Sequence, residues 1–171
     1  MKTGETFAPL RARGEDFEDW IGAGLGLDAR LRDVRDVVRG QPLPEVSAVA
    51  GVVITGSPAM LTDAAPWNAI AAQWLREAHI THSQSLLELP PTATLLASSA
   101  HDRHQAYRVG ARAWGVQFHP EFSAEVMRTY VRERQQALQA EGFDVEALLR
   151  DEQETPAASK VLRRFAALCG F

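Results

Sequence analysis

Two residues whose types and spacing suit acid–base chemistry lie in the stretch GVQFHPEF, residues 115–122. His119 and Glu121 stand two positions apart at the end of an apolar run. A histidine can take up or give a proton near neutral pH, and a carboxylate beside it can fix the imidazole tautomer and stabilise the imidazolium. Because residues i and i+2 at a strand end share one face, the two side chains could meet. The pattern alone fits a catalytic base with its orienting carboxylate and a structural hydrogen-bonded pair equally well.

A base of this kind serves a nucleophile, and the sequence offers few candidates. The one cysteine, Cys169, ends a helical stretch (AALCGF) instead of following a strand, so we interpret it as a small buried hydrophobe or tail residue. Ser57 follows an apolar run, but Pro58 comes next and the small-residue elbow of serine hydrolases is absent. A hydrolase that uses Ser57 with His119 is therefore the least supported function.

Two further pairs of histidines have spacings that metal ligands can adopt. They are His79 with His82, and His101 with His104 in HDRH. Each pair supplies only two ligands, whereas protein zinc sites use three or four. We therefore expect surface loops at both places, no metal site and no cofactor.

The composition of the chain excludes several classes of protein. A chain of 171 residues is long enough for one domain with a sizeable core, so we expect a single domain over residues 1–171. The net charge of −4 and the lack of a basic stripe argue against a nucleic-acid partner. No apolar run reaches the length of a membrane span and no leader opens the chain, so we expect no membrane association. A single cysteine excludes an intramolecular disulfide, and the expected compartment is the cytoplasm.

The elements that must position these residues follow a mixed α/β pattern. The run GVVIT, residues 51–55, is β-branched and bounded by glycines, and it predicts a buried strand that leads into the turn at Gly56–Ser57–Pro58. Segment 28–39 fits a helix or a short strand. Further strands are predicted at 94–99, 106–109 and 114–118. Helices are predicted at 16–21, at 66–78 (capped by Asp63, with Ile70, Trp74 and Leu75 inward), at 123–140 (capped by Ser123), at 144–150 and at 157–168.

Three blocks of this sequence, in this order, resemble the class I glutamine amidotransferase domain. They are GVVITGSPAMLTDAAPW (51–67), THSQSLLELPPTATLLASSAHDRHQAYRV (81–109) and AWGVQFHPEF (113–122). The resemblance covers about residues 2–132 and is greatest to stand-alone proteins similar to the amidotransferase part of GMP synthase. It implies a doubly wound, mostly parallel α/β sheet with helices on both faces. It also implies a reaction in which a cysteine thiolate attacks the side-chain amide of glutamine and releases ammonia to an acceptor enzyme.

The resemblance assigns roles to residues that match the family's motifs. His119 would be the general base and acid, and Glu121 would orient it. Gly56 and Ser57 match the glycine-rich loop after the third strand, where backbone N–H groups help to hold the tetrahedral oxyanion. His82 and Ser83 match a segment that lines the glutamine pocket in some relatives.

The family's nucleophile is absent from the matching place in this chain. In relatives it occupies a sharp strand-to-helix turn, G-x-C-x-G, between the segments equivalent to 66–78 and to THSQS. Here the two segments join directly at Ala78–His79, with no Gly, Pro or Asn between them, and we interpret this as the junction of an internal deletion. The apolar strand that precedes KTG in relatives is reduced to Met1. The deletion would remove the central strand of the sheet. We therefore expect an incomplete version of the family's fold, with a marginal fold, a compensating homodimer or a rearranged sheet.

Two functions follow from these observations. The chain is either a glutamine amidotransferase-like protein that would hydrolyse glutamine to glutamate and ammonia, or a remnant without a nucleophile. A remnant would act as a binding or interaction protein, or would be a truncated product without function. Because the elbow cysteine is absent, we predict the family's fold but no glutaminase activity of this chain, and whether it is an enzyme stays open.

Overall fold

The computed structural model describes residues 1–57, 66–78, 88–100 and 102–171, without the side chains of 75–78. The chain divides into two compact units. Unit 1 comprises Met1–Gly4 and Val34–His119, and unit 2 comprises Glu5–Asp33 and Pro120–Phe171. The predicted deletion junction at 78–79 lies at the edge of the described residues, and the single domain over residues 1–171 stays a prediction.

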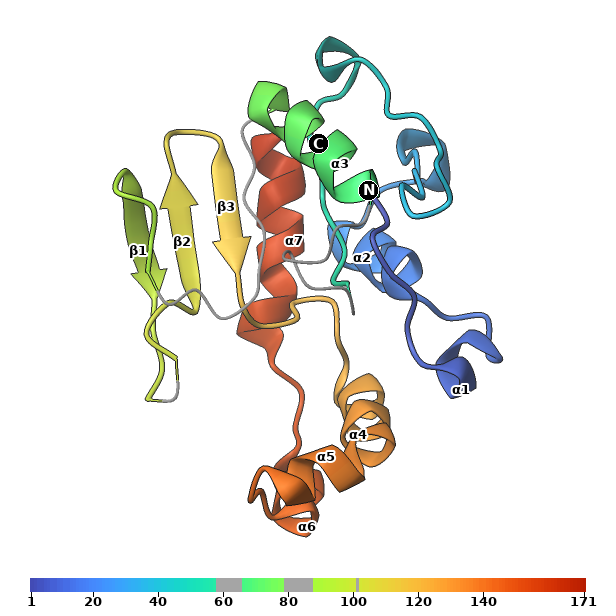
Figure 1. Cartoon of the computed structure of the whole chain (residues 1–171), viewed down its shortest axis with the longest axis vertical. Helices are drawn as coiled ribbons and strands as arrows, with labels where there is room; N and C mark the ends of the chain where they lie inside the picture. Colours follow the sequence, from blue (N-terminus) through green and yellow to red (C-terminus); the bar gives the residue numbers. More distant parts are fainter. Residues whose placement is uncertain (58–65, 79–87, 101) are drawn as a thin grey trace. The chain divides into compact units, whose positions relative to one another are not determined.

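Unit 1 contains a three-stranded antiparallel sheet in the order β1–β2–β3 (Figure 1). The strands are β1 (Ala93–Ala97), β2 (Ala106–Val109) and β3 (Ala113–Val116). Gly110 turns the β2–β3 hairpin with a φ of 59°, a conformation that glycine adopts without strain. Tyr107 pairs with Gly115 across the hairpin. A Cβ atom added at Gly115 would lie only 2.3 Å from Cζ of the Tyr107 ring. The missing side chain of Gly115 thus lets Tyr107 become buried, and all three predicted strands are confirmed to within two residues.

Unit 1 also contains a short parallel pairing of three extended segments. Lys2 N–H donates to the Arg35 carbonyl at 2.7 Å, and Val37 N–H donates to the Lys2 carbonyl at 3.2 Å. On the other side, Met1 N donates to the Val53 carbonyl at 2.8 Å, and Thr55 N–H donates to the Met1 carbonyl at 3.1 Å. Residues 1–3 therefore lie between segments 35–37 and 53–55.

This pairing corrects two predictions from the sequence. The run 51–55 is not a regular buried strand, and of its residues only Thr55 is buried. The backbone hydrogen bonds that pair this run with Met1 involve Val53 and Thr55, at one end of the run. The ambiguous segment 28–39 is neither a helix nor a strand, because a 3₁₀ turn, η1 (Ala29–Leu31), precedes the parallel bridge at Asp36. The regular sheet of the described residues is antiparallel, so the doubly wound parallel sheet is not confirmed here.

The helix α3 (Pro66–Ala78) has the bounds that its sequence predicts. Ala71 is buried, and the Trp74 indole N–H donates to the Pro44 carbonyl at 2.7 Å, just before the 3₁₀ turn η2 (Val46–Ala48). Ile70 was expected on the inner face, but it is 60% exposed. The prediction was wrong because Ala71 and Trp74, three residues apart, form the inner stripe instead. The cap at Asp63 and the side chain of Leu75 lie outside the described residues.

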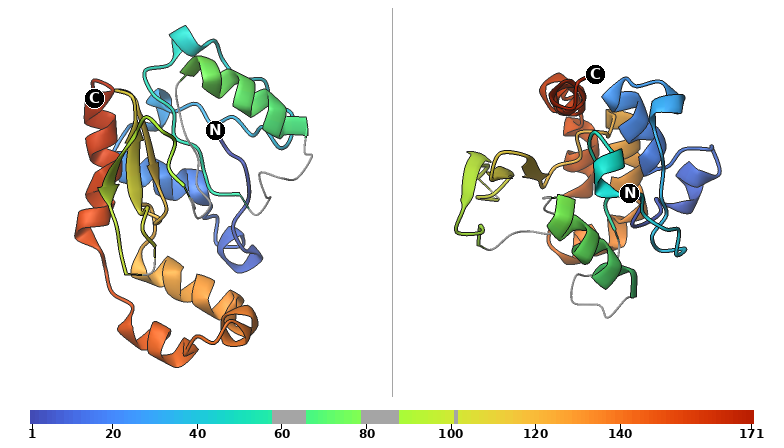
Figure 2. Two further views of the ribbon diagram at one scale, coloured as in Figure 1. Left: turned by 60° about the vertical axis from the view of Figure 1, so that its left-hand side comes forward. Right: turned by 90° about the horizontal axis from the view of Figure 1, so that it is seen from above.

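Unit 2 is helical, as views from two directions show (Figure 2). Its α2 begins with a capping box in which Asp16 and Asp19 each accept a backbone N–H, and it ends at the left-handed Gly26. The helix predicted over 123–140 is broken at Arg134, whose ψ of 9° interrupts the helical path. The helices of unit 2 are α1 (Ala8–Arg11), α2 (Phe17–Leu25), α4 (Ala124–Glu133), α5 (Gln135–Ala140), α6 (Val145–Asp151) and α7 (Pro156–Leu168).

The core of unit 2 has an aromatic part and a tight helix contact. Aromatic rings from four segments meet edge-on, stacked or tilted, and they are Phe7, Phe17, Trp20, Phe122 and Tyr130. Helix α2 packs closely on α7 because Gly24 has no side chain where Leu162 lies. No helix among the described residues is long and apolar enough to cross a membrane.

Candidate active site

His119 is exposed and lies three residues beyond the end of β3. The pairing with β2 continues only to Gln117, whose N–H donates to the Gln105 carbonyl at 2.9 Å. Pro120 and Glu121 then form a turn. The expectation that His119 and Glu121 share a face of an extended strand is therefore wrong, because Pro120 cannot donate to a ladder and the chain turns there. His119 ends unit 1, and Glu121 belongs to unit 2.

Glu121 is half-buried and is positioned by its neighbour in the sequence. Phe122 is 7% exposed, and its ring centroid lies 5.4 Å from that of Trp20 and 4.7 Å from that of Tyr130. A buried aromatic ring fixes its own backbone, so the carboxylate of Glu121 projects from a rigid point.

Glu121 also lies within electrostatic reach of a buried hydroxyl cluster. The Tyr130 hydroxyl lies 2.7 Å from Thr6 Oγ1, and Thr6 N–H donates to Asp16 Oδ1 at 2.9 Å. Burial raises the pKa of Tyr130, the hydrogen bond with Thr6 lowers it, and the negative charges of Asp16 and Glu121 raise it further. Tyr130 is therefore held as a neutral phenol beside two carboxylates.

The cluster of Thr6, Asp16 and Tyr130 was not predicted from the sequence. The capping box Asp16-x-x-Asp19 was readable as the start of a helix. The contact between Thr6 and Tyr130 spans 124 residues, and no local signal predicts it.

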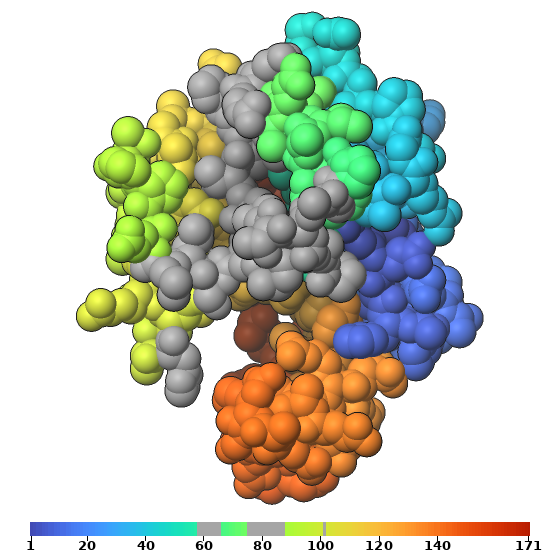
Figure 3. Space-filling model, in the orientation of Figure 1, coloured from blue at the N-terminus to red at the C-terminus, as the bar shows by residue number. Residues whose placement is uncertain are grey.

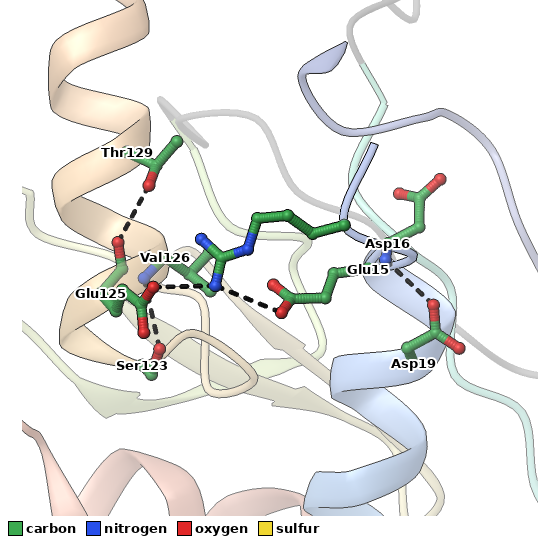
Figure 4. A network of polar contacts seen from close by, with 8 residues as sticks. Glu15, Asp16, Asp19, Ser123, Glu125, Val126 and Thr129 are labelled. Atoms are coloured by element: carbon green, nitrogen blue, oxygen red, sulfur yellow. Dashed lines mark hydrogen bonds and ion pairs between the residues drawn. The ribbon is translucent and has the colours of Figure 1, made fainter. Parts of the chain in front are cut away.

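Helix α4 begins three residues after Glu121, and its first turn is anchored by three contacts. Val126 N–H donates to the Ser123 hydroxyl at 3.2 Å, and Ala124 N–H donates to Glu154 Oε1 at 3.0 Å. Glu125 accepts a 2.8 Å bond from Arg13, whose guanidinium also lies 3.4 Å from Glu15 (Figure 4). Ser123 was correctly predicted as the cap. These contacts restrict the backbone that follows Glu121.

The loop Gly56–Ser57 is half-buried and is held by two buried threonines. The Thr3 hydroxyl donates to the Thr55 carbonyl at 2.8 Å, and Thr3 N–H donates to Thr55 Oγ1 at 2.9 Å. The Thr55 hydroxyl donates to the Gly56 carbonyl at 3.1 Å. The predicted oxyanion loop is thus tied to residues 1–3, a connection that the sequence did not reveal.

Several candidate residues fall outside the described part of the chain. They are His82 and Ser83 of the predicted glutamine pocket, with His79 and His101 of the histidine pairs. The space-filling view draws all residues outside the described ranges in grey (Figure 3). His104 is described, and its N–H donates to Asp102 Oδ1 at 2.8 Å. Among the described residues, no three His, Cys, Asp or Glu side chains are grouped as metal ligands would be.

Cys169 lies at the carboxyl end of α7, in unit 2. Burial raises the pKa of its thiol, so the neutral form is favoured. Reactive cysteines sit instead beside cations or at helix N-termini, where the thiolate is stabilised. The negative end of a helix dipole opposes a thiolate, so the surroundings of Cys169 are those of an inert thiol.

Comparison with solved structures identifies the fold. The sequence matches no family model and no curated protein. Among solved structures, the chain resembles a glutamine amidotransferase from Thermotoga maritima, with a TM-score of 0.57 and 16% identity over 80% of this chain and 84% of that one. It also resembles a glutamine amido transferase from Methylobacillus flagellatus, with a TM-score of 0.60 and 19% identity over 90% of this chain and 86% of that one. The chain therefore has a class I glutamine amidotransferase-like fold, as its motifs indicated.

Proposed function

We propose that this chain is a glutamine amidotransferase-like protein that does not hydrolyse glutamine by itself. The observation that carries the proposal is the combination of this fold with a single cysteine placed at the end of α7. The reaction needs a thiolate activated by a base. His119 and Glu121 are retained as the base and its orienting carboxylate, while the nucleophile is missing.

The finer parts of the proposal rest on the sequence motifs. These parts of the proposal are a doubly wound parallel sheet that lacks its central strand, similarity to the amidotransferase part of GMP synthase, and a cytoplasmic location. The parallel pairing of residues 1–3 with 35–37 and 53–55 supports the first of these. An ammonia-acceptor enzyme would be a partner only if activity survives.

The deciding experiment is a glutaminase assay on the purified full chain, read as ammonia released from glutamine. The wild type is compared with His119→Ala and Cys169→Ser, and folding of each is checked by circular dichroism. We expect no ammonia release above that of His119→Ala. Activity that His119→Ala abolishes would refute the proposal, and its loss or survival in Cys169→Ser would show whether that thiol is the nucleophile.

A second candidate function is a non-catalytic glutamine-binding or interaction protein. The retained Gly56–Ser57 loop, still held by hydrogen bonds, favours this reading over a product without any function. Titration calorimetry with L-glutamine tests it, since binding without ammonia release would separate a binding protein from an inert remnant. Absence of heat across millimolar glutamine would leave only the inert remnant or a protein partner.

A further inference from the structure

The short parallel pairing at the start of the chain has an outer edge on its Val53 side. The Val53 carbonyl accepts a bond from Met1 N at 2.8 Å, and Thr55 N–H donates to the Met1 carbonyl at 3.1 Å. Successive residues of an extended segment direct their backbone groups to opposite sides, so Val52 and Ile54 direct theirs away from Met1. Among the residues that the structure describes, none makes a hydrogen bond to the backbone of Val52 or Ile54. These two residues therefore form the outer edge of the pairing.

The sequence around the outer edge is that of an interior strand. No charged residue lies between Glu45 and Asp63. Interior strands of parallel sheets are continuous apolar runs, whereas edge strands usually carry charges or prolines that prevent further pairing. Val52, Val53 and Ile54 are nevertheless only half-buried. The composition of this segment thus suits a second neighbouring strand, which the described residues do not supply.

The order of the three paired segments indicates how such a neighbour would run. Segment 35–37 pairs with residues 1–3, and residues 1–3 pair with segment 53–55. The spatial order is therefore second, first, third, and all three segments run parallel. A doubly wound sheet with this beginning continues with a fourth parallel strand beside the third. The position beside the outer edge is that of the fourth strand.

We propose that the outer edge binds an extended segment of another protein as a fourth, parallel strand. The segment that fits is uncharged, rich in β-branched residues and about five residues long, the usual length of a strand. Its backbone would exchange hydrogen bonds with Val52 and Ile54, which supplies affinity, and its alternate side chains would pack beside theirs, which supplies selectivity. The proposal goes beyond the proposed function, because it holds whether or not the chain binds glutamine.

Direction distinguishes such a partner from a second copy of this chain. Two copies that meet through identical edges are related by a two-fold axis. Strands related in this way pair antiparallel, because a parallel arrangement would set N–H groups against N–H groups. A parallel strand on the outer edge therefore belongs to a different segment, and an antiparallel one would indicate self-association.

The probe for the test is a synthetic peptide, acetyl-KKVTIVVKK-amide, whose lysines keep the β-branched centre soluble. In the control peptide the isoleucine and the following valine are N-methylated, which removes a backbone donor from each side of the strand. Each peptide is added to the ¹⁵N-labelled full chain, and amide hydrogen exchange is measured by NMR. A nitroxide placed at one end of the peptide or at the other reports the direction of binding.

In the chain without peptide, we expect the amide of Thr55 to exchange slowly and those of Val52 and Ile54 to exchange fast. The probe should slow exchange at Val52 and Ile54 by at least about tenfold, the effect of about one net hydrogen bond at each amide. The N-methylated peptide should not slow it. A nitroxide at the amino end of the probe should broaden the Val49 signal more than that of Gly56, and one at the carboxyl end should do the reverse.

Two variants test the same edge from the side of the chain. Val52→Lys places a charge on the edge, which hinders pairing, and should weaken peptide binding by at least about tenfold. Val34→Lys is the matched control, because it adds the same charge at a position 48% exposed, before segment 35–37 on the other side of the pairing. Ile54→Pro removes an N–H that faces outward, which a strand edge tolerates, so the variant should fold and lose peptide binding.

Several results would overturn the proposal. Slow exchange at Val52 and Ile54 in the dilute chain alone would mean that the edge is already covered. Protection that grows with chain concentration, or an antiparallel probe, would assign the edge to a second copy. Protection by the N-methylated peptide, or protection confined to β1, would mean that the probe binds elsewhere or without strand pairing. The measurements on the wild type decide the matter even if a variant does not fold, and failure to bind glutamine leaves them unaffected.

Discussion

The thiol of Cys169 is disfavoured as a nucleophile by its own helix. It is half-buried at the carboxyl end of α7, and burial raises its pKa. We therefore predict that iodoacetamide modifies Cys169 in the folded chain several-fold more slowly than in the same chain in urea. The folded-state rate should keep rising with pH beyond about 8.5, the ordinary cysteine pKa. Mass-spectrometric kinetics measure both, and a plateau below that pH would contradict the prediction.

Glu152 offers a pH-dependent test at the residue scale. Burial raises its pKa, the charge of Glu154 raises it further, and Arg128 lowers it. A raised pKa means that the folded state binds protons more tightly, so the free energy of unfolding falls as pH rises through the interval between the unfolded and folded pKa values. We expect Glu152→Gln to raise the urea midpoint at pH 7 and to lose this advantage below about pH 4, near the unfolded-state pKa of glutamate. Glu146→Gln, at an exposed position on α6, is the control.

At the scale of elements, two glycines of α2 face different neighbours, and only Gly24 faces α7. A Cβ at Gly24 would lie 2.4 Å from Leu162 Cδ1, and Leu162 is buried. A Cβ at Gly22 would lie 1.4 Å from Arg32 Nη1, the far end of a flexible side chain whose buried Nε has no hydrogen-bond partner among the described residues. The first clash is with the core, and the second can be relieved by rotation.

The two alanine substitutions in α2 are therefore expected to change the free energy of unfolding in different directions. Gly24→Ala should destabilise the protein by about 1–2 kcal/mol, because overpacking outweighs the gain in helix propensity. Gly22→Ala should be neutral or stabilising by up to about 1 kcal/mol, since Arg32 moves aside and the propensity gain remains. Urea denaturation measures both, and equal losses would mean that Arg32 is held in place.

The elements that the sequence predicted well are those with local signals. Helix α3 begins at Pro66 as a proline at the first position suggests, and Ser123 caps α4 as its type predicts. The hairpin strands follow from short apolar runs separated by Gly110. The break at Arg134 was missed because helical residues continue on both sides of it.

The site was predictable in its residue types and less so in its geometry. The motif placed His119 after a strand, but the turn at Pro120–Glu121 replaced the extended path that the spacing suggested. The contacts that hold the site are distant in sequence, such as Thr3 with Thr55 and Thr6 with Tyr130. Only packing brings such residues together, so no window of sequence contains them.

At the scale of the molecule, one edge of the antiparallel sheet bears on the predicted homodimer. Among the described residues, β1 is an edge strand of its sheet, with Leu95 47% and Leu96 55% exposed, and no charged residue lies between Pro90 and Ala100. Edge strands that lack charges tend to pair with other chains. We expect the wild type to associate reversibly at micromolar concentration and Leu96→Lys to remain monomeric in sedimentation equilibrium. Leu148→Lys in unit 2 is the control, and a monomeric wild type would refute the dimer.

The parallel pairing of residues 1–3 has a consequence for the order in which the chain folds during synthesis. Both partner segments, 35–37 and 53–55, are made after residues 1–3. At about 5–20 residues per second, several seconds pass before Thr55 leaves the ribosome and can bond to Met1 and Thr3. Meanwhile α2, whose caps are all local, can already form. A slowed ribosome would therefore prolong the exposure of these early residues to proteases and chaperones.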